Sequence, residues 1–351
     1  MKPLFSILLV TPIFAALAIT FNSKGSSLVS SLKGPSDIPS KAPPVSFTFN
    51  AFGDSGWSQS HNRLSSANSS FKRHYLKMDP GSSLRADLNY INWETSVGKT
   101  CNQFWSAPSP SHYAFLTHPS ELSDAVSLGF NVVGLANNHS YDCLASIEGN
   151  GPLQSLSHLS KIQSNYNNEG TALLFSGLFR QPSKAVASGV MKVKNGHVPV
   201  SFLSAYVGGN QSHCRYISCA FALEKYAPEL KKKKGLRILA LHSWNRESHT
   251  QLKALLQSWL SRDLVDIAIG SGPHVAESVS IVKTPKGDKV KATSLGNFIH
   301  PGLGYQPNNI VLRTGWTYLP ESNQLELESL SAVKVSCNGE RCVMGGSRKY
   351  K

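Results

Sequence analysis

The amino-acid sequence predicts an α/β protein, built as a mixed sheet or a two-sheet sandwich flanked by helices. Strand-like and helix-like segments alternate through the first part of the chain, whereas strand-like segments dominate the later part. The chain has 351 residues, of which 40% are hydrophobic and 9% aromatic. This composition is sufficient for a buried core and argues against global disorder.

The first part of the chain is expected to alternate between strands and helices. Residues 45–52 alternate apolar and polar side chains, which indicates a strand that ends in Gly53-Asp54-Ser55-Gly56. Further strands are expected at residues 86–93, 130–136 and 171–175. Helices are expected at residues 69–78, 121–128 and 153–164.

The later part contains two expected hairpins. One joins residues 185–194 to 198–206 through an Asn195-Gly196 turn, and the other joins 275–283 to 289–295. The remaining expected elements are an irregular stretch at 208–234, strands at 236–241 and 265–270, an amphipathic helix at 250–261 and a strand-rich region at 309–336. We see no internal repeat and expect one domain over residues 45–336, followed by a basic tail with a disulfide turn at 337–351.

The N-terminus has the features of an export signal. Lys2 provides a short positive region, residues 4–18 are mostly apolar, and small residues occupy the expected cleavage site. We therefore expect a signal peptide at residues 1–18 and a flexible linker at 19–44, with an uncleaved membrane anchor as the alternative. In either case the protein is expected to be exported, as a periplasmic, extracellular or membrane-anchored protein.

The six cysteines agree with export. Two close pairs, Cys214 with Cys219 and Cys337 with Cys342, could each close a small turn, which leaves Cys101 with Cys143. None of these pairs has the CxxC spacing that is common at zinc sites. Three disulfides are therefore favoured over a zinc cluster.

The net charge of +14 favours anionic partners. These include polyanionic polymers, phosphate esters, nucleic acids and acidic lipids, although a charge excess also serves solubility alone. Nucleic acid is the least favoured partner, because the sequence contains no zinc finger, RNP-type aromatic motif or basic helix.

Polar side chains follow several of the expected strands at the points where they end. They are Asp54, Glu94, Asn138, His139, His242 and His274. Taken singly, a Gly-Asp pair is a common turn, Glu94 could lie on the surface, and His242 could be a satisfied core histidine. Together they predict a site, because ligands gather at the carboxyl ends of strands in α/β folds. Mixed oxygen and imidazole ligands favour one or two ions of Mn²⁺, with Zn²⁺ or Fe²⁺ as alternatives.

The order of these motifs resembles the CapA family of capsule and poly-gamma-glutamate synthesis proteins. The matching blocks are Phe52-Gly53-Asp54, Asn92-Trp93-Glu94, Leu135-Ala136-Asn137-Asn138-His139 with Asp142, Leu241-His242, Gly272-Pro273-His274 and Ser294-Leu295-Gly296-Asn297-Phe298. The family's domain is related to calcineurin-like metallophosphoesterases, so the resemblance implies a metallophosphoesterase-like two-sheet sandwich flanked by helices.

The resemblance also implies a role for each residue. Asp54 and His274 would hold one metal, Glu94 would bridge two, and Asn138 and His242 would hold the second. His139 would protonate the leaving group, and Asp54 would belong to the catalytic centre. The implied chemistry is metal-assisted hydrolysis of a phosphoester, with an anionic polymer or phosphoester as substrate and membrane-associated polymer synthesis machinery as a possible partner.

This sequence departs from the family pattern at Gly272, where the family usually has a histidine ligand of the second metal. Two functions follow. One is a metal-dependent hydrolase, and the other is a non-catalytic polyanion-binding or assembly factor with a degraded metal site. A Gly272→His variant is expected to bind more metal if the ligand was simply lost. A Cys101–Cys143 disulfide would join the loops that carry Glu94 and Asn138.

Overall fold

The computed structural model describes residues 42–56, 70–105, 113–167, 172–182, 185–209, 213–300, 305–338 and 341–351. The expected signal peptide at 1–18 lies outside these ranges, as does the expected linker up to residue 41. Within them, no helix is both long and apolar enough to cross a membrane.

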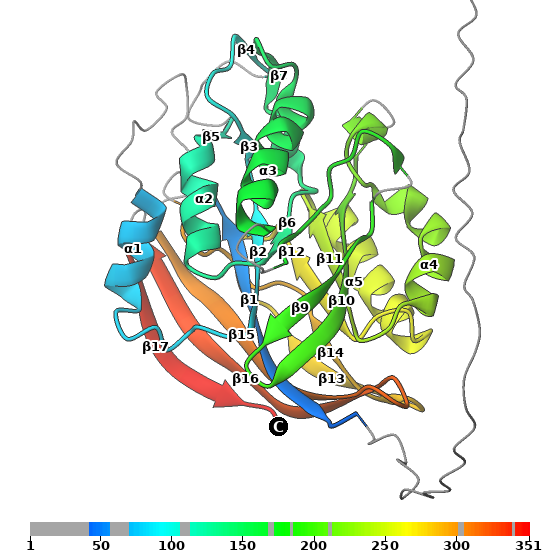
Figure 1. Ribbon diagram of the computed structural model, residues 1–351. Coiled ribbons are helices and arrows are strands. Elements are labelled where there is room, and N and C mark those ends of the chain that lie inside the picture. Colours follow the sequence, from blue (N-terminus) through cyan, green and yellow to red (C-terminus); the bar gives the residue numbers. More distant parts are fainter. Residues whose placement is uncertain are drawn as a thin grey trace, which may run out of the picture. The chain divides into compact units, whose positions relative to one another are not determined.

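Two large sheets form the centre of the molecule (Figure 1). The first has the order β17-β16-β15-β1-β2-β6-β8 and the second β13-β14-β12-β11-β10-β9. The strands of the first are β17 (Arg341–Lys349), β16 (Gln324–Asn338), β15 (Tyr305–Leu319), β1 (Val45–Ser55), β2 (Leu88–Trp93), β6 (Val132–Gly134) and β8 (Leu174–Ser176). Those of the second are β13 (Val279–Thr284), β14 (Gly287–Ala292), β12 (Ile267–Ser271), β11 (Leu236–Ser243), β10 (Gly196–Val207) and β9 (Ala187–Val193).

The two sheets pack face to face, and helices cover their outer faces. One apolar cluster combines side chains from both sheets, including Phe49, Phe202 and Leu312. A second cluster joins the first sheet to α1 (Ser70–Met78), α2 (Pro119–Ser127) and α3 (Gly151–Asn167). A third joins the second sheet to α4 (Ala227–Lys232) and α5 (Arg246–Ser261) (Figure 1). The expected two-sheet sandwich flanked by helices is therefore confirmed.

The position of the central strands explains why their sequences are almost continuously apolar. Every residue of β2 and β11 is buried, because each strand lies inside a sheet that is covered on both faces. Strand β1 pairs parallel to β2, and β2 to β6, whereas β10, β11 and β12 run parallel in the second sheet. Each sheet thus presents a set of parallel carboxyl ends.

The C-terminal segment differs from the sequence prediction. Residues 341–349 were expected to belong to a basic tail, but they form edge strand β17, which pairs antiparallel with β16. The Gly345-Gly346 pair and the basic residues gave this segment no strand signal, so its pairing depends on the neighbouring strand. The stretch expected to be irregular at 208–234 also contains short helices, including α4.

The predicted cysteine pairing is confirmed. Disulfides join Cys101 to Cys143, Cys214 to Cys219, and Cys337 to Cys342. The first is supported by a small sheet in which β4 (Gln103–Phe104) pairs with β7 (Cys143–Ala145). A second small sheet joins β3 (Ser96–Val97) to β5 (Leu116–Thr117). Both small sheets belong to the loops that follow Glu94 and Asn138.

Candidate metal centre

The parallel carboxyl ends of both sheets meet at one place. Asp54 lies in the last part of β1, Glu94 follows β2, and Asn138 begins a short 3₁₀ helix after β6. From the second sheet, His242 lies near the end of β11 and His274 follows β12. The structure brings all five predicted metal ligands together.

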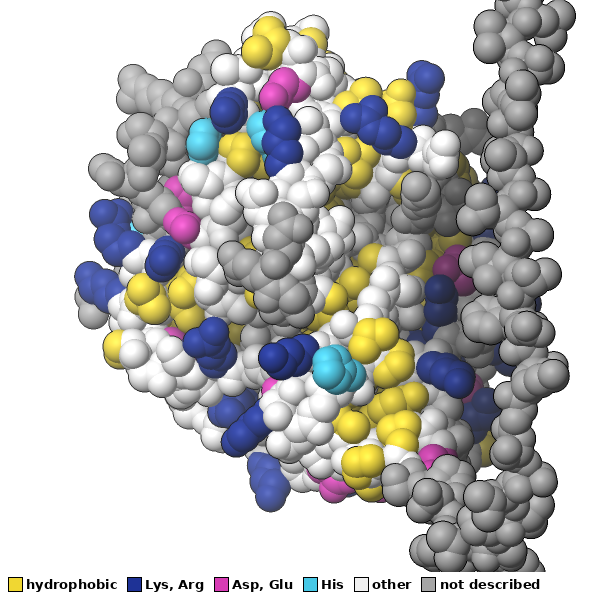
Figure 2. All heavy atoms as spheres, viewed as in Figure 1, with side chains coloured by type: hydrophobic (Ala, Val, Ile, Leu, Met, Phe, Trp, Pro, Cys, Tyr) yellow, Lys and Arg dark blue, Asp and Glu magenta, His cyan; other side chains and the backbone are white. Residues whose placement is uncertain are grey.

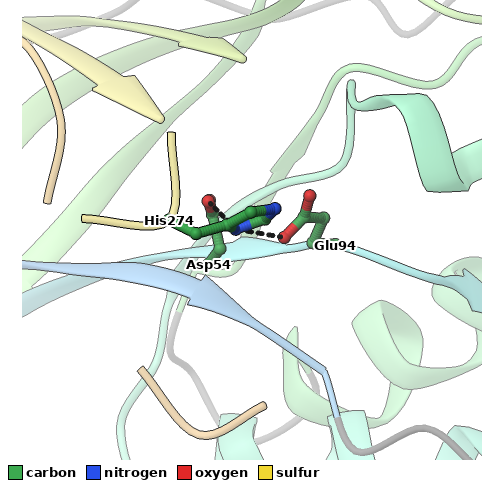
Figure 3. A group of neighbouring side chains, drawn as sticks. All are labelled: Asp54, Glu94 and His274. Carbon is green, nitrogen blue, oxygen red and sulfur yellow. Dashed lines mark ion pairs between the residues drawn. The ribbon is translucent and has the colours of Figure 1, made fainter. Parts of the chain in front are cut away.

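Asp54, Glu94 and His274 form the tightest group. His274 Nδ1 lies 3.6 Å from Asp54 Oδ2 and 4.0 Å from Glu94 Oε2, and Figure 3 shows the imidazole between the two carboxylates. Ligand atoms of all three residues lie within 4.8 Å of one another. Both acids are buried, whereas the His274 side chain is 35% exposed, so the group is reached from solvent on the histidine side.

His242 connects this group to Asn138. Its Nε2 lies 2.7 Å from Asn138 Oδ1 and 3.2 Å from Glu94 Oε1, and its Nδ1 lies 3.7 Å from Asp54 Oδ1. The hydroxyl of Ser271, 2.8 Å from Nδ1, fixes the ring from the other side. His242 is therefore buried, and both of its ring nitrogens have polar partners within the cluster.

The carboxylates and imidazoles of the cluster stabilise each other's charges. Burial alone would raise the pKa of Asp54, but the neighbouring imidazoles of His242 and His274 lower it well below its usual range. Burial disfavours the charged imidazoles, yet the Glu94 and Asp54 carboxylates outweigh burial and raise the pKa of His242 to about 9 and that of His274 to about 10. Without a bound cation, protons on the histidines balance the two acids.

Glu94 is the least satisfied member of the cluster. Both of its carboxylate oxygens are buried, and neither accepts a hydrogen bond from any residue that the structure describes. A buried carboxylate without hydrogen bonds is unfavourable unless another positive group binds it. Together with the carboxylate of Asp54 and two imidazoles, this donor set fits a divalent transition metal.

His139 lies beside the cluster and is held by Asp142. Its Nδ1 is 2.6 Å from Asp142 Oδ2, and the backbone N–H of Phe115 also donates to that oxygen. Burial lowers the pKa of His139, but the Asp142 carboxylate outweighs it, so the net shift is upward. A proton held in this way leaves Nε2–H free to donate to a leaving group.

Position 272 cannot hold the histidine that the family pattern led us to expect. Gly272 has φ +118°, and a Cβ atom there would lie 1.7 Å from the carbonyl oxygen of Ser243. Its backbone N–H instead donates to Asp54 Oδ2 over 3.2 Å. A Gly272→His variant is therefore expected to distort the loop, and the simple restoration of metal binding anticipated from sequence is corrected by this geometry.

Three polar residues of the site were not singled out as site residues from sequence. Asn92 donates to Asp54 Oδ1 over 2.7 Å, and Asn297 lies 2.9 Å from His274 Nδ1. Both stand inside motifs that were recognised as blocks, so the signal was present. His300, buried and 4.0 Å from Glu94 Oε2, lies beyond the last block and carried no signal.

A close backbone contact places the segment that carries Asn297 and His300. The backbone N–H of Asp54 donates to Gly296 O, and Phe298 N–H donates to Asp54 O, so residues 296–299 extend the sheet beside the end of β1. A Cβ atom on Gly53 would lie 2.0 Å from Gly296 O. Glycine at position 53 is therefore needed for this approach, which gives the common Gly-Asp pair a specific structural reason.

Comparison with known proteins gives one family. The model of the bacterial capsule synthesis protein PGA_cap matches residues 48–301, which include every predicted site residue. No curated protein matches the chain. Among solved structures, a novel phosphatase from Mycoplasma pneumoniae is similar at 14% identity, covering 84% of this chain and 95% of that chain with a TM-score of 0.47. A 5′-nucleotidase from Candida albicans is similar at 10% identity, covering 82% and 51% with a TM-score of 0.35.

Proposed function

The chain belongs to the bacterial capsule synthesis protein family PGA_cap, and we propose that it is an exported, metal-dependent hydrolase of the phosphoesterase type. It acts outside the cytoplasm in the synthesis or handling of an anionic capsule-type polymer such as poly-gamma-glutamate. The substrate is the polymer or an associated phosphoester, and membrane-associated synthesis machinery is the expected partner.

The observation that supports this proposal is the unsatisfied carboxylate of Glu94. It is buried between His242 and His274, beside the second acid Asp54, with no hydrogen bond from the described residues. Asp54 and His274 would hold one cation with Glu94, and Asn138 and His242 would hold a second with the same carboxylate. Mn²⁺ is the favoured ion, with Zn²⁺ or Fe²⁺ as alternatives.

A bound cation of this kind supplies a Lewis acid for a phosphoryl oxygen and lowers the pKa of a bound water. The protein's own contribution is positioning and proton transfer. Asn92 donates to Asp54 Oδ1 and so holds that carboxylate in place. His139, held in place by Asp142, donates its Nε2 proton to the oxygen of the departing group.

The surface of the protein suits an anionic substrate. The net charge is +14, and Figure 2 shows Lys and Arg side chains distributed over the face in view, with few acidic side chains among them. Such a distribution raises the local concentration of a polyanion over a broad area instead of directing it to a single patch. The resulting attraction is expected to weaken as salt screens it.

The hydrolase proposal is tested with the purified exported protein after removal and controlled return of metal. Hydrolysis of bis(p-nitrophenyl) phosphate should require added Mn²⁺. His139→Asn should lower the rate by about 10²- to 10⁴-fold on esters with poor leaving groups. The loss should be much smaller with p-nitrophenolate, which leaves without protonation.

His197→Asn provides the matched control, because His197 is exposed on the β9–β10 hairpin. This variant should keep full activity on both kinds of ester. Absence of hydrolysis with Mn²⁺, Zn²⁺ and Fe²⁺ would rule out the hydrolase proposal. An equal loss on both esters in His139→Asn would rule out its role as the acid.

The second candidate function is a polyanion-binding or assembly factor with a reduced metal site. Gly272 favours it, because glycine offers no side-chain ligand and the backbone at this position leaves no room for a larger residue. In that case the Asp54→Asn/His274→Asn double variant should bind poly-gamma-glutamate as tightly as the wild type. Binding that instead disappears with the metal would exclude this alternative.

A further inference from the structure

His300 is a buried histidine with unused hydrogen-bonding capacity. Its side chain is completely buried, and neither ring nitrogen has a hydrogen-bond partner among the described residues. A buried imidazole without hydrogen bonds is unfavourable, because each ring nitrogen has lost its hydrogen bonds to water and gained none in return. Such a group in a folded protein therefore needs an explanation.

The fold holds His300 firmly next to the metal centre. The N–H of Gly56 donates to the carbonyl oxygen of Ile299, so the residue before His300 is tied to the chain just beyond β1. The ring of Phe115 packs against His300 with a centroid separation of 4.9 Å and an interplanar angle of 65°. The backbone beside His300 is therefore fixed by pairing, and Phe115 packs against its imidazole.

The nearest charged group to His300 is the unsatisfied carboxylate of the centre. His300 Nε2 lies 4.0 Å from Glu94 Oε2, and His274 Nδ1 lies 4.0 Å from the same oxygen. These separations are too long for hydrogen bonds. Each of these two separations fits a pair of donors bound to one ion, because two donors each about 2.1 Å from a metal lie about 3.0 to 4.2 Å apart. His300 lies outside the group of ligand atoms that are all within 4.8 Å of one another, so its imidazole would have to turn toward Asp54 and His274 to complete the set.

We infer that His300 is a further ligand of the cation held by Asp54, Glu94 and His274, and that its Nε2 supplies the fourth donor. The inference rests on the proposed metal centre. It explains two unsatisfied buried groups, Glu94 Oε2 and His300 Nε2, because both atoms would bind the same cation. It also separates the two positions of the centre, because His300 approaches the Glu94 oxygen that faces His274 and not the one that faces His242.

A fourth protein donor changes the chemistry of this position. Two carboxylates with two imidazoles favour Mn²⁺, Fe²⁺ or Zn²⁺ over Mg²⁺ and Ca²⁺, which prefer oxygen ligands. The position next to Asn138 and His242 is left with fewer donors, because Gly272 contributes none. We therefore expect one tight ion and one weak ion, and not two equivalent ions.

The test compares His300→Phe with the wild type, using Mn²⁺ and Co²⁺ as probes. Equilibrium dialysis should show the tightest site weakened by at least about tenfold in the variant, the size of loss seen when even supporting groups of a metal site are removed. The visible absorption of bound Co²⁺ should change as well, because a nitrogen ligand is lost. His158→Phe is the control, since His158 is also buried but pairs with Glu148.

Thermal unfolding provides a second readout that a merely structural role would not reproduce. Without metal, His300→Phe should be at least as stable as the wild type, because an unsatisfied polar ring is replaced by an apolar one. With metal, it should gain less stability than the wild type. His300→Asn serves if the phenylalanine variant does not fold.

The outcomes separate this inference from the proposed function. If the wild type and His300→Phe bind Mn²⁺ equally tightly, His300 is not a ligand, although the metal centre stands. If the wild type binds none of the added metals, the metal centre and the role of His300 both fail. If His158→Phe weakens binding as much as His300→Phe, the effect is a general one on packing and the inference is overturned.

Discussion

Strands β11 and β12 have a cluster of buried charged side chains near each end, and the two clusters neutralise their carboxylates differently. Near the amino ends, Asp266 is held by Arg237 Nε and Nη2 over 3.0 and 2.9 Å and also by Lys289. Near the carboxyl ends, Asp54 and Glu94 face imidazoles, and the Glu94 oxygens accept no hydrogen bond from the described chain.

The difference separates a structural cluster from a binding cluster. Arginine and lysine remain charged at every physiological pH, so the Asp266 cluster is complete by itself. Burial raises the pKa of Asp266, but Arg237 and Lys289 outweigh burial and lower it. Imidazoles can lose their protons to make room for a metal, so the carboxylates at the other end can exchange proton partners for a cation.

The largest expected effect comes from removing the acid of the structural cluster. Asp266→Ala leaves the buried Arg237 and Lys289 with only the carboxylate of Asp263 as a counter-charge, which should lower the free energy of unfolding by up to about 3 to 5 kcal/mol. Urea denaturation with the disulfides intact measures the loss. Glu224→Ala, at an exposed pair with Arg262, should lose no more than about 1 kcal/mol. A loss that small in Asp266→Ala would contradict the structural assignment.

A smaller effect is expected from metal at the other cluster. A metal present at about a hundred times its dissociation constant should stabilise the wild type by about 2.7 kcal/mol. Glu94→Gln should abolish that gain, whereas Glu277→Gln should keep it, because Glu277 pairs with His249 and Lys253 away from the centre. Calorimetric unfolding with EDTA and with Mn²⁺ gives both values. Equal gains in the two variants would place the metal elsewhere.

The smallest effect is a pH dependence of metal affinity. In the metal-free protein the pKa values of His242 and His274 are raised to about 9 and about 10. The stability that the two charged imidazoles contribute is therefore complete below about pH 6.5, and it is lost as the pH rises through those pKa values. Metal binding must displace these protons. Affinity should therefore increase by about tenfold per pH unit for each proton released, or about 1.4 kcal/mol.

Titration calorimetry between pH 6 and about pH 8.5, in buffers with different ionisation enthalpies, counts the released protons. The same titration on a His158→Phe background should give the same count, because His158 lies outside the centre. If no protons are released and the metal affinity is constant over this pH range, neither imidazole binds the metal.

The sequence was sufficient for most of the sandwich and for the convergence of the site. Buried parallel strands have apolar runs that can be recognised, and their carboxyl ends must meet, so Asp54, Glu94 and His242 could be placed together before the structure was known. Strand β17 could not be predicted in this way, because its residues have weak strand propensity and pair only through β16.

Two features of the site depend on contacts between distant parts of the chain, which a local sequence motif cannot reveal. The need for glycine at position 272 arises from the carbonyl of Ser243, which belongs to a neighbouring strand. The place of His300 arises from the pairing of residues 296–299 with the end of β1, which brings a residue outside every motif to Glu94. Both the glycine requirement at 272 and the place of His300 therefore depend on the tertiary fold, whereas the spacing of a motif describes only residues that are close in sequence.

The origin of the ligands in two different sheets has a mechanical consequence. Asp54 and Glu94 belong to the first sheet and His242 and His274 to the second, so an ion bound by all of them would fasten one sheet to the other. The sheets could then separate only after the ion is released. Metal occupancy would thus slow unfolding more than it speeds folding, and it would lengthen the lifetime of the folded protein.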